Sequence, residues 1–269
     1  NTGTDTLDRW EVDTANCDEI SIEVTQADDI PPELGEGYSH KLQIKTVESA
    51  IAADEIVRLL HFPEAYDCQR LGYGTANTKT TTLSFWVKSS IAGTFAVNIY
   101  ADDGADIIGS TYTISSADTW EKKSVTFAGN TSDAFDLTSN ANGMEVSIWT
   151  AAGTSFSSSG STTGGAWNAD ATYRAGGLSN AFSTTNNATI EITGYQFEIG
   201  NVATDFEQIP FDISLRRCQR YLERIDKSST ETVICIGQGT SGSSIFGRIN
   251  FATEKRVVPS ATISDASHI

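Results

Sequence analysis

The sequence has few of the residues and motifs on which enzyme active sites usually depend. Histidine occurs only three times in 269 residues, at His40, His61 and His268. No G-x-S-x-G or H-E-x-x-H motif is present, nor a glycine-rich phosphate loop followed by lysine. Two carboxylates suffice for glycoside hydrolysis, but a chain with 35 acidic residues supplies such a pair by chance. The sequence therefore predicts that the chain is not an enzyme.

Cysteine is also sparse. The four residues, Cys17, Cys68, Cys218 and Cys235, form no C-x-x-C pair and have no histidine at the spacing of a zinc site. The spacing therefore argues against zinc. A chain of this size does not need disulfides, and thiols assembled in a reducing cytoplasm usually stay free. We interpret all four cysteines as structural.

Long apolar runs and a basic surface are lacking as well. No stretch approaches 18 consecutive apolar residues and the first residues show no signal-peptide pattern, so neither membrane insertion nor a secretory leader is expected. Residues 1–209 carry 10 Lys and Arg against 29 Asp and Glu, a balance of −19, whereas residues 210–269 carry 8 against 6, a balance of +2. An acidic chain repels phosphate backbones, which excludes nucleic acid as a partner. We interpret the acidity as favouring solubility.

Strand patterns dominate what is present. Apolar and polar residues alternate in many short stretches, and turn sequences such as ADDGAD (101–106) and NANG (140–143) separate them. This rhythm predicts an all-β antiparallel sandwich. The clearest strands are residues 40–46, 82–89, 93–100, 120–127, 144–150 and 188–193.

Three segments depart from this rhythm. Residues 52–60 (AADEIVRLL) are expected to form a short helix, with a strand as the alternative. Residues 151–189 are rich in Ser, Thr and Gly, and the aromatic residues within them favour a long loop that packs onto the domain rather than a free linker. Residues 213–225 (ISLRRCQRYLERI) predict an amphipathic helix whose apolar stripe is Leu215, Cys218, Leu222 and Ile225.

That helix has two interpretations, one in which it packs on its own sandwich and one in which it forms a seam between subunits. After it, residues 232–239, 243–251 and 256–264 predict three more strands. The organisation expected is therefore a sandwich over 1–209, a connecting helix over 210–226 and a small, incomplete-looking β unit over 227–269.

Several motifs, taken in order, resemble a known family. They are YSHKLQI (38–44), TTLSFWVKSSIAGTFAVNIY (81–100), ISSADTWEKKSVTF (114–127), ITGYQFEIGNVATDFE (192–207) and CQRY (218–221). Together they resemble the carbohydrate-binding-module jelly rolls of bacteriophage tail-fibre and related virion proteins. The resemblance implies a jelly-roll β-sandwich and a place in the virion, assembled in the host cytoplasm. It also implies a homo-oligomer, most simply a trimer, that contacts other virion proteins and a host-surface polysaccharide.

Strand parity suggests where such a polysaccharide would bind. In each of three strands one set of alternate residues is entirely apolar and typical of a core, and the other set mixes aromatic with polar side chains. Mixed faces of this kind suit sugars, whose C–H surfaces stack on rings while their hydroxyls need hydrogen-bond partners. The alternative is that a loop or a neighbouring subunit covers these aromatics. The predicted glycan-binding residues are Trp86, Asn98, Tyr100, Glu145 and Trp149.

Two further functions stay open at this stage, a purely structural tail or capsid connector and a polysaccharide depolymerase. The resemblance also implies a structural calcium between the first strands and the last one. Carboxylate oxygens are the ligands that calcium prefers, and the alternative for these residues is a solvated surface. The expected ligands are Asp205, Asp8, Glu11 and Glu23.

Overall fold

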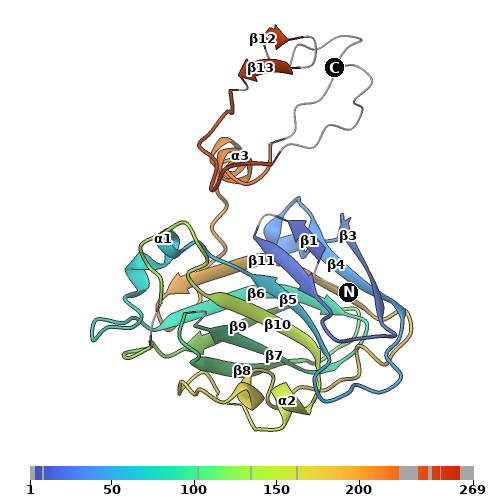
Figure 1. Cartoon of the computed structure of the whole chain (residues 1–269). Coiled ribbons are helices and arrows are strands. Elements are labelled where there is room, and N and C mark those ends of the chain that lie inside the picture. The colour runs from blue at the N-terminus through green and yellow to red at the C-terminus, as the bar shows by residue number, and fades with distance from the viewer. Residues whose placement is uncertain are drawn as a thin grey trace. The chain divides into compact units, whose positions relative to one another are not determined.

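The structure is a computed structural model of the whole chain. It describes residues 4–7, 9–101, 103–133, 135–161, 163–223, 236–241, 244–248 and 250–260. The chain divides into two units, Asn1–Glu207 and Gln208–Ile269. Figure 1 shows the elements of each unit.

The first unit contains two antiparallel sheets. The six-stranded sheet has the order β1-β2-β5-β10-β7-β8, and the five-stranded sheet has the order β3-β4-β11-β6-β9. The strands of the first are β1 (Thr4–Leu7), β2 (Trp10–Asp13), β5 (Ile56–His61), β10 (Glu145–Ala152), β7 (Gly93–Tyr100) and β8 (Ile107–Ile114). Those of the second are β3 (Ser21–Ala27), β4 (Ser39–Thr46), β11 (Thr189–Ile199), β6 (Thr81–Ser89) and β9 (Glu121–Phe127). The predicted all-β antiparallel sandwich is confirmed.

The core lies between the two sheets and follows strand alternation. In β6, Leu83, Phe85 and Val87 are fully buried, because every second side chain of a strand points to the same face. In β7 and β10 the same parity buries Val97 and Ile148 in the same core cluster. Burying each such side chain stabilises the fold by roughly 1.5–3 kcal/mol. The apolar sets identified in the sequence are therefore the inner faces.

The helix expected over 52–60 is wrong. The segment enters strand β5, which lies between β2 and β10 in the six-stranded sheet. Ile56, Val57, Leu59 and Leu60 are all buried, because the core covers one face of β5 and other segments cover its second face. A strand buried on both faces reads as a continuous apolar run, which periodicity alone does not distinguish from a helix.

The long segment 151–189 is the packed loop that the sequence predicts. It contains the short helix α2 (Thr154–Ser157) and the 3-10 turn η3 (Ala171–Tyr173). Ala175 and Phe182 within it are fully buried. The other short turns of this unit are η1 (Pro32–Leu34), α1 (Ala65–Cys68) and η2 (Gln69–Leu71).

The second unit contains helix α3 (Phe211–Gln219) and a two-stranded sheet of β12 (Ile236–Ser241) and β13 (Ser244–Arg248). The expected helix is therefore shorter than predicted, since Leu222 lies beyond its end, and Ile225 falls outside the described residues. Of the expected third strand, residues 256–260 are not in a strand and 261–264 fall outside the described residues. None of the described helices is long and apolar enough to cross a bilayer.

An aromatic cluster joins the two sheets of the first unit. Trp10 of β2 stacks on His61 of β5 with ring centroids 4.6 Å apart, and Tyr195 of β11 meets Trp10 edge-on at 4.7 Å. The hydroxyl of Tyr195 lies 3.2 Å from Nδ1 of His61. Burial, helped by the positive charge of Arg9, lowers the pKa of His61 to about 3. His61 is therefore neutral in the folded protein at physiological pH.

This burial predicts that acid weakens the fold before the carboxylates titrate. Because the folded-state pKa of His61 is lowered, the unfolded chain takes up the proton first, and stability is lost as the pH falls from about 6.5 toward 3. One such group contributes at most about 1.4 kcal/mol per pH unit. We expect His61→Phe, which keeps an aromatic ring but does not titrate, to flatten the decline in unfolding free energy between pH 6.5 and 4.5, measured by urea denaturation.

Tyr195→Phe is the matched control, since it removes the same hydrogen bond but leaves the imidazole. It should retain the wild-type pH dependence. Equal slopes for wild type and His61→Phe would contradict the assignment.

Candidate functional site

The structure splits the predicted glycan-binding residues between two sheets. Asn98 and Tyr100 lie on β7 and Glu145 and Trp149 on β10, all in the six-stranded sheet, where Glu145 pairs with Tyr100. Trp86 lies on β6 of the five-stranded sheet. Strand parity placed all five correctly on the outer faces of their sheets. It carried no information on which sheet each strand joins.

The outer face of the six-stranded sheet is covered. Trp149 and Asn98 are 0% exposed, so the expectation of an exposed aromatic face is wrong at these positions. Loop 151–189 provides the cover: Trp149 packs with Ala175 in a second apolar cluster, and the ring of Phe156 lies 5.8 Å from that of Trp149. The alternative in which the Ser/Gly-rich loop covers the aromatics therefore describes this face.

A polar network fills the rest of the covered face. Nε of Arg58 donates to Asp13 at 2.9 Å, and its NH1 group donates to Oε1 of Glu145 at 2.5 Å. The guanidinium of Arg174, from the loop, lies 3.9 Å from the ring centre of Tyr100. Charges inside a protein need partners of opposite sign. Arg58 and Glu145 therefore supply each other with the opposite charge that a buried ionised group requires.

The indole of Trp149 belongs to the same layer. Its Nε1 donates to Oδ1 of Asn98 at 2.5 Å, and the guanidinium of Arg58 lies 4.9 Å from the ring centre. Asn98 therefore serves the buried tryptophan, whose N–H would otherwise lack an acceptor. Tyr100, Glu145 and Trp149 thus contact residues of the loop, and Asn98 supports Trp149.

The outer face of the five-stranded sheet differs, because its aromatic residue is only partly covered. Trp86 is half-buried and lies between Thr193 of β11 and Lys122 of β9, its partners in the strand register. Lys122 is exposed. Lys88, two residues along β6, lies opposite Glu191. Polar and charged side chains therefore surround one partly exposed indole ring.

Two loops continue this face beside Lys88. Its ammonium is paired with Asp29 and lies 3.2 Å from Glu191. The same ammonium lies 5.2 Å from the ring centre of Trp120, whose Nε1 donates to Asp29 at 3.2 Å. The hydrogen bonds from Lys88 and Trp120 lower the pKa of Asp29. We define the Trp86 face as Trp86, Lys88, Trp120, Lys122, Glu191 and Thr193.

Sequence reasoning found only Trp86 of this face. Sequence reasoning missed that Lys122 lies on the same face of the sheet as Trp86 and Lys88. That shared face is known only once β9 is paired with β6. Strand pairing, a non-local property, was needed to gather them.

A glycine shapes the surroundings of Trp86. Gly194 has φ +57° at an irregularity in the pairing of β11 with β6. A Cβ atom there would lie 2.9 Å from Leu34 and 3.1 Å from the Trp86 ring. The left-handed backbone and the close contact both require glycine. Gly194 therefore allows the ring of Trp86 to lie close to the backbone of β11.

The remainder of the outer face carries the segment that follows β11. Gln196 donates to the hydroxyl of Thr204 at 2.8 Å, and Glu198 accepts from the backbone N–H of Thr204 at 2.9 Å. The backbone N–H of Glu207 donates to Oε1 of Gln196 at 2.8 Å. In the motif QFEIGNVATDFE, Gln196, Glu198 and Thr204 thus form a set of hydrogen bonds, here called the lock, that holds residues 201–207 on the sheet.

The residues expected to bind calcium are not gathered. Asp8 lies outside the described residues, and Glu23 is exposed and paired with Lys45 at 2.8 Å. Glu11 is on β2 of the six-stranded sheet, whereas Asp205 is exposed in the segment after β11. Among the described residues, the group of three close potential ligands consists instead of Cys17, Glu48 and Glu55.

The electrostatics of that group are unfavourable for charge. Burial, and then repulsion by Glu55, raise the pKa of Glu48. Burial is also the main cause that raises the pKa of the Cys17 thiol to about 11, and the nearby carboxylates add to it. The thiol donates to the carbonyl of Ile56 at 3.3 Å.

Comparisons with known proteins leave the family open. No family model matches the chain, and no curated protein matches it. Solved structures that match include the enzymatically active domain of tailspike protein 4 of bacteriophage CBA120, at 13% identity and a TM-score of 0.39. That match covers 71% of this chain but only 19% of the tailspike chain.

Carbohydrate-binding modules are also among the matches. A family 11 module of a Clostridium thermocellum cellulase matches at 11% identity over 74% of this chain and 92% of its own, with a TM-score of 0.36. The xylan-binding domain CBM22-1 of Paenibacillus barcinonensis matches at 10% identity over 72% and 87%, with a TM-score of 0.35. At these TM-scores the likeness is too loose to assign an activity.

The covered face predicts a large stability cost when its charges are separated. Glu145→Ala leaves Arg58 and Arg174 with less compensation inside the fold. We expect it to lower the unfolding free energy by about 3 kcal/mol or more, measured by chemical denaturation. Glu23→Ala, which breaks the exposed pair with Lys45, should cost less than about 1 kcal/mol. Similar losses for both variants would contradict a structural role for the network.

Proposed function

We propose that the first unit is a non-catalytic module that binds a polysaccharide on the Trp86 face. The observation that carries this proposal is the position of Trp86, a partly exposed indole on the outer face of a sheet with Thr193 and Lys122 beside it. The corresponding face of the other sheet is closed by loop 151–189. The Trp86 face is therefore the sheet surface on which an extended chain of sugars has room to lie.

The chemistry of the Trp86 face matches that of a sugar. The apolar C–H side of a pyranose stacks on an indole ring, and its hydroxyls need donors and acceptors around the ring. The exposed Lys122 supplies N–H donors and the hydroxyl of Thr193 supplies an acceptor, while Lys88 is held by Asp29 and by the buried Glu191. Held on strands rather than on mobile loops, these groups keep their spacing without a ligand, which lowers the cost of binding.

The charges at this face favour binding over hydrolysis. A glycosidase needs one carboxyl group that holds a proton near neutral pH. Asp29 and Glu191 both pair with Lys88, and the pKa of Asp29 is lowered rather than raised. Asp29 is therefore not suited to donate a proton. The carboxylates beside Trp86 therefore fit hydrogen-bond acceptors better than catalytic acids.

We further propose that the module belongs to a phage attachment protein and recognises a host-surface glycan from the virion. The support is the sequence resemblance of residues 192–207, whose Gln196, Glu198 and Thr204 form the lock after β11. A single face with one main aromatic residue binds sugars weakly. A trimeric fibre would present three copies, and avidity then raises the apparent affinity without new contacts.

The test is binding of the purified chain to a panel of bacterial surface polysaccharides, with wild type compared with Trp86→Ala. We expect the variant to lose about tenfold in affinity, since truncation removes the apolar ring surface that a sugar would cover, worth on the order of 1.5 kcal/mol. The affinity is measured by titration calorimetry or on an array.

Tyr66→Ala is the matched control, because Tyr66 is an aromatic residue 53% exposed on α1. It should bind as wild type does, with folding of all variants checked by circular dichroism. If wild type binds no glycan, or if Trp86→Ala binds equally well, the result would contradict the proposal and favour a purely structural connector.

A further inference from the structure

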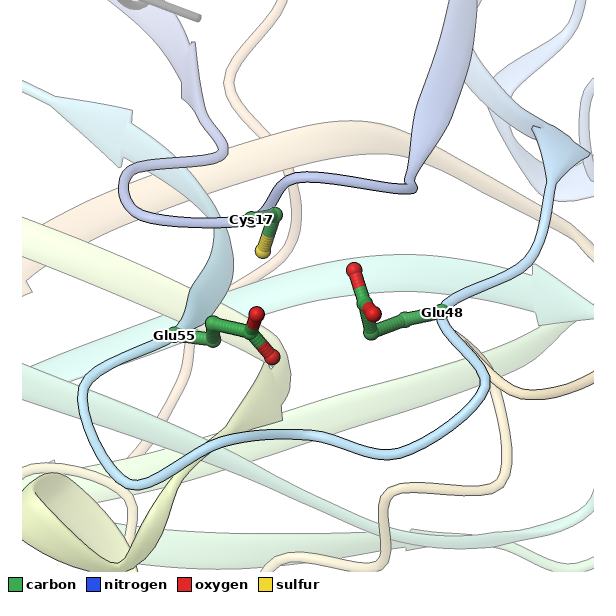
Figure 2. Close-up of side chains that lie close together, drawn as sticks. All are labelled: Cys17, Glu48 and Glu55. Atoms are coloured by element: carbon green, nitrogen blue, oxygen red, sulfur yellow. The ribbon is translucent and has the colours of Figure 1, made fainter.

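Two crossovers between the sheets meet at a cluster of potential metal ligands. Cys17 lies in the connection from β2 to β3, and Glu48 and Glu55 lie near the two ends of the connection from β4 to β5. Figure 2 shows the three side chains directed into one common space. One ligand atom from each lies within 4.8 Å of the others, and all three residues are buried.

An oxygen of this cluster has no partner. Oε2 of Glu48 is buried without a hydrogen bond, in a residue only 2% exposed. Figure 2 shows this carboxylate facing the space between Cys17 and Glu55. Leaving a buried carboxylate oxygen unsatisfied is costly, and natural proteins avoid it unless something else fills the position. The unpartnered Oε2 of Glu48 therefore points to a bound ligand that contacts this oxygen.

Three other buried carboxylates of the domain have a positively charged partner. Asp13 and Glu145 are paired with Arg58, and Glu191 is paired with Lys41 and Lys88. Among the described residues, neither Glu48 nor Glu55 has an ion pair with a lysine or arginine. The charges recorded around Glu48 are all acidic, from Glu55, Glu19 and Asp18. The cluster therefore lacks the positive charge that the fold supplies at the other three sites.

We propose that Cys17, Glu48 and Glu55 bind a zinc ion. The ligand set decides between cations: calcium and magnesium take oxygen ligands, whereas zinc accepts thiolate sulfur and carboxylate oxygen together. Zinc–ligand bonds of about 2.0–2.3 Å place tetrahedral ligand atoms about 3.3–3.7 Å apart, which a small movement of these side chains achieves. A double positive charge would also offset the repulsion between the two carboxylates.

The site would stabilise more than its own loops. The backbone N–H of Glu48 donates to the carbonyl of Ser183 at 3.0 Å, and the carbonyl of Glu55 accepts from the backbone N–H of Gly153 at 2.8 Å. Both ends of the loop that covers Trp149 are thus attached to the two zinc-binding glutamates. Metal bound here would tie the two crossovers together and hold that loop against the six-stranded sheet.

The test uses the full chain with Cys218→Ser and Cys235→Ser, so that the two thiols of the second unit do not compete for metal. The protein is stripped with a chelator and titrated with Zn²⁺ and, separately, with Co²⁺ and Ca²⁺. We expect one Zn²⁺ per chain, an increase in melting temperature on binding, and a thiolate-to-metal charge-transfer band with Co²⁺.

The variants separate this site from adventitious binding. Glu48→Gln keeps the shape of the side chain and should weaken Zn²⁺ binding by about 100-fold or more, since even outer-shell changes cost about 10- to 100-fold. Cys17→Ala should abolish the Co²⁺ band. Cys68→Ala removes the same atoms from another buried thiol and should bind as the parent does.

Three results would overturn the proposal. The first is a parent protein that gains no thermal stability from Zn²⁺. The second is Co²⁺ binding without a thiolate band, or binding of Ca²⁺ in preference to Zn²⁺, either of which would indicate a site of oxygen ligands alone. The third is a Glu48→Gln variant that is more stable than its parent without metal and binds Zn²⁺ no more weakly, which would show that Glu48 is buried as the neutral acid. The parent's spectrum decides the matter even if Cys17→Ala does not fold.

Discussion

The arrangement of this domain depends on the burial of Trp149 beneath loop 151–189. The indole lies on the outer face of the six-stranded sheet, where solvent would normally be, and it is fully buried among neighbouring strand residues and residues of the loop such as Phe156 and Ala175. Its N–H requires an acceptor, which Asn98 provides, and the charges beside it require partners, which Arg58 and Glu145 provide for each other. Once this layer forms, the six-stranded sheet is covered on both faces.

The loop covers the outer face of the six-stranded sheet, and the outer face of the five-stranded sheet remains the surface proposed to contact a ligand. The five-stranded sheet keeps a half-buried tryptophan on its outer face, and its lysines and acidic residues form a mixed polar border. The segment after β11 occupies the rest of this surface through Gln196 and Glu198. The open area is therefore confined to the region around Trp86, where Gly194 gives the ring space. The proposed binding surface and the covered surface lie on opposite sides of one sandwich.

The cluster of Cys17, Glu48 and Glu55 differs from the other buried charged groups described above, because no lysine or arginine among the described residues pairs with it. The buried carboxylates Asp13, Glu145 and Glu191 are paired with arginine or lysine, at a cost in desolvation that good geometry offsets. Here two glutamates and a thiol approach one another without such a partner among the described residues. A cation supplied from solution would complete the pattern that the protein follows at its other buried carboxylates.

Local features of this protein could be read from the sequence alone. Alternation in stretches such as TLSFWVKS identified strands and their inner faces, because side chains of a strand alternate whatever its neighbours are. The aromatic residues of 151–189 marked a loop that packs. Only the tertiary structure decided the features that depend on strand pairing. Trp86 lies on a different sheet from Trp149, and residues 56–61 form a strand because they pair between β2 and β10. Cys17 lies close to glutamates 31 and 38 positions away in the chain. These contacts are set by strand register and crossovers, which join residues distant in the chain and leave no periodic trace in it.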